Sequence, residues 1–218
     1  MHAPRILVCA IATLVACGSS DNTTVDGNVT QHDASRDGAG SNANEVTGQV
    51  NGQSFDAKDA IWNQFNHTNG FSFVGNAAFV EMTDYAGACA LAAQDLAPTT
   101  SRILDLGVAV NDASGMSSVP TVAGTFTVYS SASPLPASAK VAQVYFGSGC
   151  SKDIEYEGVS GTVTIATVHS DGSYAGTFDV VVSCSAFSNC AGADAHLTGQ
   201  FTSAACASLN VNTIPACS

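Results

Sequence analysis

Apolar and polar residues alternate along most of the chain beyond Glu45. Successive side chains of an extended strand point to opposite faces of a sheet, so a period of two predicts strands with one buried face. The pattern is clearest where Val163 and Ile165 alternate with threonines. The residues expected to face inward are Leu104, Leu106, Val108, Val110, Phe126, Val128, Ala142, Val144, Phe146, Val163, Ile165, Phe178, Val180, Val182, Ala195, Leu197 and Phe201.

Turn dipeptides separate these alternating segments. Asn51-Gly52, Asn69-Gly70 and Asp171-Gly172 each stand between strand-like runs. Such pairs readily adopt the positive φ angles that a two-residue hairpin requires, so antiparallel pairing is expected. In the segment around the second dipeptide, four apolar residues are expected to share one face, namely Phe71, Phe73, Ala77 and Phe79.

The pattern as a whole predicts a mainly β domain over residues 45–218. About nine strands are expected, arranged either as an antiparallel β-sandwich or as a closed β-barrel. One helix is indicated over residues 85–96, which are rich in Ala and Leu and are followed by Pro98. Because Cys89 lies within this segment, a disulfide is expected to hold the short helix to the sheet.

The beginning of the chain has a different pattern. Arg5 precedes an apolar run over residues 6–15, which is too short for a permanent membrane span and is typical of a signal peptide. The run ends at Leu14-Val15-Ala16-Cys17-Gly18, where small residues directly precede a cysteine. This segment resembles the lipobox of bacterial lipoproteins. The resemblance implies removal of residues 1–16, lipid attachment at Cys17 and residence in the outer membrane.

Residues 18–44 contain almost no apolar side chain and are rich in Asp, Ser, Asn and Gly. A segment of this composition cannot bury a core. The expected organisation is therefore a signal peptide at 1–16, a lipidated cysteine with a disordered tether at 17–44, and a β domain at 45–218. The chain thus resembles bacterial lipoproteins that join a lipobox and a polar tether to a small β domain, a resemblance that implies no catalytic residue.

Six cysteines belong to the expected domain, and an exported chain uses such a set mainly for disulfides. Three disulfides are therefore predicted. Six cysteines allow 15 pairings, and the sequence does not choose among them. Short separation along the chain favours the set Cys184–Cys190, Cys206–Cys217 and Cys89–Cys150.

The chain is strongly acidic, with 18 Asp and Glu residues against 6 Lys and Arg residues. Loss of Arg5 with the signal peptide would leave a net charge of −13. This charge repels nucleic acid. The Gly-x-Gly at residues 38–40 lies in the tether with no strand before it, so a nucleotide site is not expected either.

Three carboxylates form the candidate site for chemistry. Asp153, Glu155 and Glu157 alternate with Ile154 and Tyr156. In a regular strand these carboxylates would line one face about 6.6 Å apart. Calcium binds several carboxylate and carbonyl oxygens, so the row is a candidate for Ca²⁺, the one cofactor considered. The simpler interpretation, which we favour, is a solvated edge whose like charges discourage aggregation.

Two histidines lie near acidic residues. His169, Ser170 and Asp171 have the residue types of a hydrolase triad, but neighbouring side chains diverge at a hairpin tip. His196 follows Asp194 by two residues, which supplies two possible metal ligands where a structural zinc site needs four. Both features are better explained as surface residues, so no catalytic residue is assigned.

We therefore expect a non-enzymatic binding or structural module that contacts a protein or polysaccharide of the cell envelope. Trp62, Phe65 and Tyr85 are candidates for a sugar-stacking platform, with burial in the core as the simpler alternative. Two other functions stay open. One is an exported hydrolase that uses a carboxylate or metal site, and the other is an accessory subunit of an envelope machine. Whether the domain faces the periplasm or the cell surface is also open.

Overall fold

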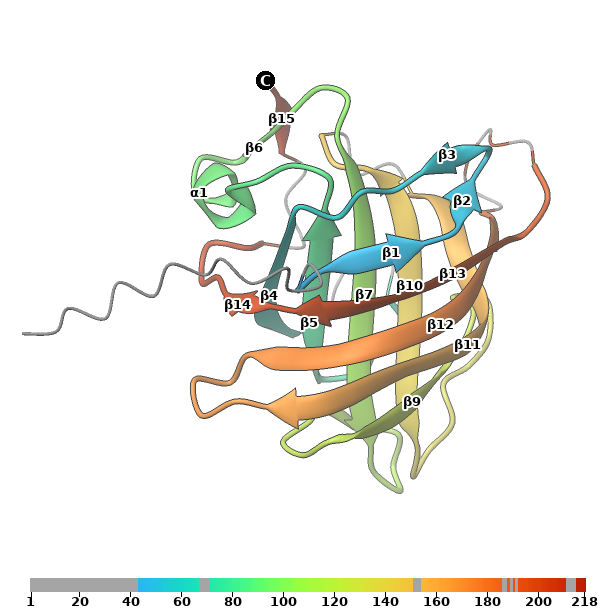
Figure 1. The fold of residues 1–218 in the computed structure, drawn as a ribbon. Coiled ribbons are helices and arrows are strands. Elements are labelled where there is room, and N and C mark those ends of the chain that lie inside the picture. The colour runs from blue at the N-terminus through green and yellow to red at the C-terminus, as the bar shows by residue number, and fades with distance from the viewer. Residues whose placement is uncertain are drawn as a thin grey trace, which may run out of the picture. The chain divides into compact units, whose positions relative to one another are not determined.

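One mixed sheet of eleven strands forms the body of the domain (Figure 1). The computed structural model describes residues 43–66, 71–150, 154–185, 188, 190, 192–210 and 215–218. The strands of the sheet are β1 (Glu45–Thr47), β4 (Asp59–Asn66), β5 (Asn76–Thr83), β7 (Arg102–Asn111), β8 (Ser117–Ser118), β9 (Gly124–Val128), β10 (Lys140–Ser148), β11 (Ile154–Val168), β12 (Tyr174–Cys184), β13 (Ala195–Thr202) and β14 (Ala204–Ala205). Two small pairs lie outside it, β2 (Gln49–Val50) with β3 (Gln53–Ser54) and β6 (Leu96–Ala97) with β15 (Ala216–Cys217).

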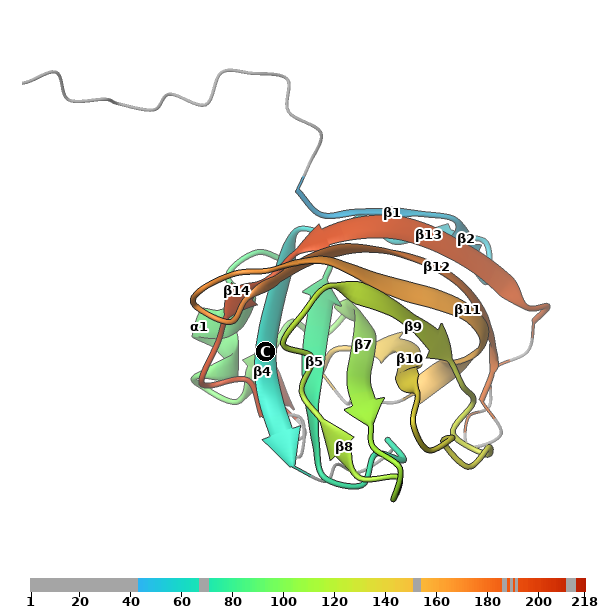
Figure 2. The ribbon, with the colours of Figure 1, turned by 90° about the horizontal axis from the view of Figure 1, so that it is seen from below.

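The sheet curls strongly into a half-barrel (Figure 2). Its strand order is β1-β13-β12-β11-β9-β10-β7-β5-β4-β14, with β8 attached to β7. The expected mainly β class is confirmed. The expected antiparallel arrangement holds for most pairs, but β9 with β10 and β14 with β4 are parallel. The sheet is a mixed half-barrel and not a clear sandwich or closed barrel.

The two ends of the sheet approach each other at one corner. β13 pairs with β1 and β12, and after Ser203 the chain continues as β14, which pairs with β4. The Ser203 hydroxyl donates a hydrogen bond to the carbonyl of Tyr174 over 3.0 Å. The ring of Tyr174 in turn packs edge-on against Trp62 of β4, with 4.9 Å between centroids. Side-chain packing between β12 and β4 therefore connects the two ends of the sheet at this corner, where backbone pairing does not close the barrel.

Bulges in β11 explain how such a long strand follows the curl. The register of β11 against β12 shifts around Val159 and again around Ala166. Each bulge inserts one residue and increases the local twist. The buried positions change accordingly, from Tyr156 before the first bulge to Val163 and Ile165 after it. The bulges thus keep apolar side chains inside although strict alternation is interrupted.

The concave face of the sheet holds the larger core. Its buried members include all the residues expected to face inward except Val110, which packs against the core while partly exposed. Phe126, Val163, Val180 and Leu197 are completely inaccessible. The sequence pattern therefore predicted this face correctly.

A second core covers the convex face of β4, β5, β7 and β10. It contains Phe73, Ala77 and Phe79, with Phe71 packed against it, so the predicted shared face of these four residues is confirmed. The helix α1 (Ala88–Ala92) and the segment after β14 contribute Ala88, Cys206 and Leu209. Because this cover buries the convex side, seven of the eight residues of β5 are buried.

Two of the three predicted hairpins lie within the described residues. At Asn51-Gly52, φ angles of 53° and 75° connect β2 to β3 as predicted. The hairpin between β11 and β12 also forms, but its loop is longer than the expected two residues. His169 donates its backbone N–H to the carbonyl of Ser173, and Gly172 has a φ of 84°. Asn69-Gly70 lies outside the described residues, although β4 and β5 on either side pair antiparallel.

The expected short helix is present but covers less chain. α1 begins at Ala88 and ends at Ala92, where residues 85–96 were predicted. Asp59 of β4 accepts a hydrogen bond from the backbone N–H of Ala88, and this contact fixes the start of the helix. Among the residues that the structure describes, no helix has the length and apolar character needed to cross a membrane.

Three disulfides join the six cysteines, as predicted. The Cys184–Cys190 pair is confirmed, whereas the other two expected pairs are wrong. Cys89 of α1 pairs with Cys206 beneath the helix, and Cys150 pairs with Cys217. The reason is that β15 lies parallel to β6, which carries Cys217 away from Cys206 and toward the end of β10. Separation along the chain did not reflect this arrangement.

Candidate functional site

The predicted acidic row is interrupted by a third bulge in β11. Against β10, Tyr156 pairs with Phe146 and Ile154 pairs with Gly147, so Glu155 is the extra residue. A bulge changes the direction in which the following side chains point. Glu155 and Glu157 consequently have different surroundings, and Asp153 lies outside the described residues.

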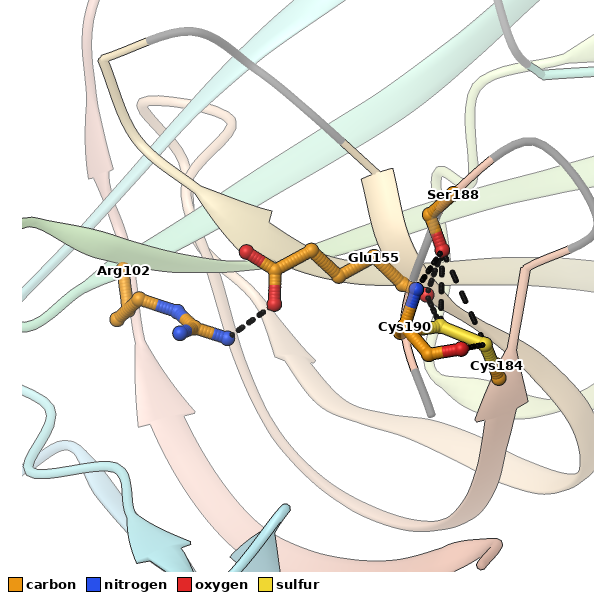
Figure 3. Close-up of polar contacts among 5 residues, drawn as sticks. All are labelled: Arg102, Glu155, Cys184, Ser188 and Cys190. Carbon is orange, nitrogen blue, oxygen red and sulfur yellow. Dashed lines mark hydrogen bonds and ion pairs between the residues drawn. A yellow bond between two sulfur atoms is a disulfide. The ribbon is translucent and has the colours of Figure 1, made fainter. Parts of the chain in front are cut away.

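Glu155 takes part in a polar cluster at the end where β7 begins (Figure 3). Its carboxylate lies 3.0 Å from Nη2 of Arg102, and the guanidinium lies 4.7 Å from the ring centroid of Phe146. The backbone carbonyl of Glu155 accepts hydrogen bonds from the N–H of Ser185 and the hydroxyl of Ser188. The Cys184–Cys190 disulfide closes the loop that carries these serines. Contacts of the Glu155 carboxylate and of its backbone carbonyl therefore both stabilise the bulge.

Replacement of Arg102 tests this structural role. Arg102→Ala removes a partly exposed ion pair, worth up to about 1 kcal/mol, and a cation–π contact worth about 0.5–1 kcal/mol. We expect the free energy of unfolding to fall by about 1–2 kcal/mol in urea denaturation. Glu155→Gln keeps the packing of Arg102 on Phe146, so the expected fall in the free energy of unfolding is about half as large. At high salt this fall becomes smaller still, because salt screens the ion pair that Glu155→Gln removes. Equal losses for both variants would contradict the stacking contribution.

Glu157 lies in a row of polar residues that runs across the strands. The register places Glu81 opposite Asp105, Asp105 opposite Tyr145, and Tyr145 opposite Glu157. The carboxylate of Glu157 accepts a hydrogen bond from the Ser131 hydroxyl. Burial raises the pKa of Tyr145 well above its ordinary value, and the negative charges of Glu157 and Asp105 add to this effect. No local pattern in the sequence indicates this row, because its members come from four strands.

The row does not supply an assembled metal centre within the described residues. There, no three His, Cys, Asp or Glu side chains are grouped in a way that could hold a metal ion. Glu81 and Asp105 are buried, with 5% and 8% of their surfaces exposed. The calcium hypothesis for Glu155 and Glu157 thus gains no geometric support from their different surroundings.

The two histidine motifs are surface features. Asp171 accepts hydrogen bonds from the hydroxyl and backbone N–H of Ser173, which lower the pKa of Asp171 below its ordinary range. These bonds close the hairpin loop. His196 lies 2.7 Å from Asp179 on the neighbouring strand, with both side chains largely exposed. Neither arrangement resembles the Ser-His-Asp geometry of a hydrolase.

The proposed aromatic platform does not form. Trp62 packs against the concave core, whereas Phe65 and Tyr85 belong to the convex side of the sheet. Phe65 is 7% exposed and lies edge-on to Phe79 at 5.6 Å. The three aromatics therefore contribute to two different cores, in agreement with the alternative that placed them in the protein interior.

A hydroxyl-lined hollow lies at the opposite end of β7 from Arg102. It has a volume of about 540 Å³, within the range of small-ligand sites. We call it the serine hollow, after its polar lining of Ser72, Asn111, Ser114, Ser117, Ser131 and Ser133. Sequence reasoning missed it, since its serines come from three segments that lie far apart along the chain. The Ser-rich composition of residues 114–118 and 130–133 was the available signal.

The chain was also compared with known proteins. No protein-family model matches it, and no significant match was found among curated proteins or solved structures.

Proposed function

We propose that this chain is an outer-membrane lipoprotein whose β domain serves as a non-enzymatic binding or structural module of the cell envelope. The lipid on Cys17 anchors the chain, and residues 17–44 form the tether. The partner is an envelope protein or polysaccharide. The observation that carries the proposal is the complete pairing of the six domain cysteines in three disulfides.

Disulfides support export because they form and persist in oxidising compartments. The signal-peptide pattern and Cys17 support the same route, since lipidation follows export in the lipoproteins that this segment resembles. A lipid anchor with two or more acyl chains is stable, because each buried methylene contributes about 0.8 kcal/mol. Export and anchoring together support residence in the envelope.

The contacts of Glu155 and Asp171 give both carboxylates a structural role. Glu155 pairs with Arg102 and holds a bulge, while Asp171 closes a hairpin. A general acid or base must reach a reacting group in a substrate site. Both carboxylates instead serve local structure, so no observation raises the exported hydrolase above the binding module. The accessory subunit differs from our proposal mainly in its partner.

Cys17→Ala tests the anchor. Cells are labelled with a clickable palmitate analogue, and the native chain is expected to carry label and to fractionate with the outer membrane. The variant is expected to lose the label and to leave the outer-membrane fraction, because the thiol that accepts the lipid is absent. Cys9→Ala, a cysteine change within the signal peptide, serves as the matched control and should keep native labelling.

Protease treatment of intact and lysed cells then identifies the exposed side. Cleavage of the native domain in intact cells would support a role in contact with external glycans or cells. Protection until lysis would favour the accessory-subunit alternative on the periplasmic side. Label on Cys17→Ala, or a native chain found in the cytoplasm, would contradict the proposed function.

A further inference from the structure

The serine hollow combines hydroxyl groups with an absence of charge in its lining. Its six polar residues are five serines and one asparagine, and among the residues that the structure describes no charged side chain lines it. The rest of its lining is Val74, Gly115, Ala132, Pro134 and Leu135, and Val74 is 57% exposed. Met116 beside Gly75 is 50% exposed and extends this apolar rim. The hollow therefore presents hydroxyl oxygens next to small apolar surfaces.

The hydroxyl protons of the hollow are largely committed to internal partners. Ser117 donates to the side-chain carbonyl of Asn111 over 2.8 Å, and the Asn111 amide donates to the carbonyl of Pro136 over 2.9 Å. Ser72 donates to the carbonyl of Ser131 over 3.2 Å. A serine hydroxyl has one donor and two acceptor positions. Ser117 and Asn111 are buried, and the Ser117 hydroxyl also accepts the backbone N–H of Val74, so these two groups serve the structure of the wall. The Ser72 hydroxyl also accepts from the Gln143 amide and keeps one acceptor position. A ligand at the accessible serines must therefore bring donors of its own.

Ser131 and Ser114 follow the same pattern. Ser131 donates to the carboxylate of Glu157, and Ser114 donates to Asp112 over 2.6 Å. Asp112 also accepts the backbone N–H groups of Ser114 and Met116, and these bonds lower its pKa below the ordinary range. These hydrogen bonds give the loop that borders the hollow a defined conformation without a ligand, so the site is preorganised. A shaped site reduces the entropy lost on binding.

The loops are also tied to one another. The backbone N–H of Ser117 donates to the carbonyl of Val74 over 2.6 Å, and Gly75 forms a β-bridge with Ser117. A Cβ at Gly75, whose φ is 113°, would lie 2.6 Å from the carbonyl oxygen of Ser117. The close approach of these two segments fixes one wall of the hollow.

From this lining we infer that the serine hollow binds a short stretch of neutral polysaccharide. Sugar rings carry many hydroxyl donors, which match the acceptor oxygens of the hollow, and their C–H surfaces match the apolar rim. The net charge of the chain disfavours acidic glycans and phosphates, and the described residues of the lining include no cation to offset it. This inference rests on the proposed function and names the ligand class of the envelope-binding module.

The test uses the full-length protein, purified in detergent, on an array of immobilised neutral and acidic oligosaccharides. The native chain is expected to bind neutral glycans and not acidic ones. Ser133→Trp places an indole at an exposed position in the hollow and is expected to weaken binding by at least about tenfold. Ser170→Trp makes the same change at the exposed tip of the β11–β12 hairpin and is expected to bind like the native chain. Equal thermal unfolding of both variants verifies that the fold is intact.

Two results would overturn the inference. Equal glycan binding by Ser133→Trp and the native chain would exclude the hollow as the site, and failure of the native chain to bind any neutral glycan would exclude the ligand class. The proposed function is judged separately by Cys17-dependent anchoring and by cross-linking in intact envelopes. Cross-linking of the native chain to an envelope protein, with no neutral glycan bound on the array, would support the module while excluding the ligand class.

Discussion

Loss of the Cys89–Cys206 disulfide is expected to lower the free energy of unfolding by about 4 kcal/mol. The bond joins residues separated by 117 positions, and it links α1 to the segment that covers the convex core. The interleaved Cys150–Cys217 bond shortens the effective loop in the unfolded chain to about 72 residues, which still costs substantial closure entropy. The measurement is denaturant unfolding of the Cys89→Ala/Cys206→Ala variant beside the native domain.

The matched comparison is Cys184→Ala/Cys190→Ala. This pair closes a loop with a sequence separation of 6, so the same entropy argument gives a loss of about 2 kcal/mol. Both variants replace two cysteines by alanines in an otherwise unchanged chain. A loss for the short loop equal to that for the long one would contradict the entropic explanation. It would instead indicate that the contacts of Ser185 and Ser188 with the Glu155 bulge dominate.

The concave face could be predicted because one physical rule determines it. Phe178, Val180 and Val182 occupy every second position of β12, and burial of one face then follows directly from strand geometry. Bulges limit this rule. Around Val159 the register shifts by one residue. The only local signal of the shift is the pair of flanking glycines, Gly158 and Gly161, because a glycine inside a strand often marks a bulge. The same limitation separated Glu155 from Glu157, which simple alternation had placed on one face.

Residues that are far apart along the chain and meet in the fold could not be predicted for a different reason. Cys184 and Cys190 lie close along the chain, so their pairing follows from proximity. Cys206 and Cys217 are also close, but packing of β15 against β6 carries Cys217 elsewhere. The serine hollow depends on three separate segments of the chain in the same way. Its residues become neighbours only through strand order, which one sequence does not specify.

The alternation of apolar residues predicted one part of the convex core and not the other. Alternation indicated that Phe73 and Phe79 share a face but not that loops and α1 would cover it. In β5, Ala78 and Val80 face the concave core while Ala77 and Phe79 face the convex one. A strand buried on both sides needs apolar residues at successive positions, as in the segment Ala77–Val80.

Phe79→Ala is expected to lower the free energy of unfolding by about 3–5 kcal/mol, because it removes a large side chain that neighbouring groups cannot easily replace. Phe79 is 1% exposed, and its ring contacts Phe65 and Phe71 at centroid distances of 5.6 Å and 5.4 Å. Val122→Ala, at a side chain that is 63% exposed, is the control and should change stability by less than about 0.5 kcal/mol. Both are measured by denaturant unfolding. A loss below about 1 kcal/mol for Phe79→Ala would mean that the convex cover contributes little packing, and that the concave core alone stabilises the half-barrel.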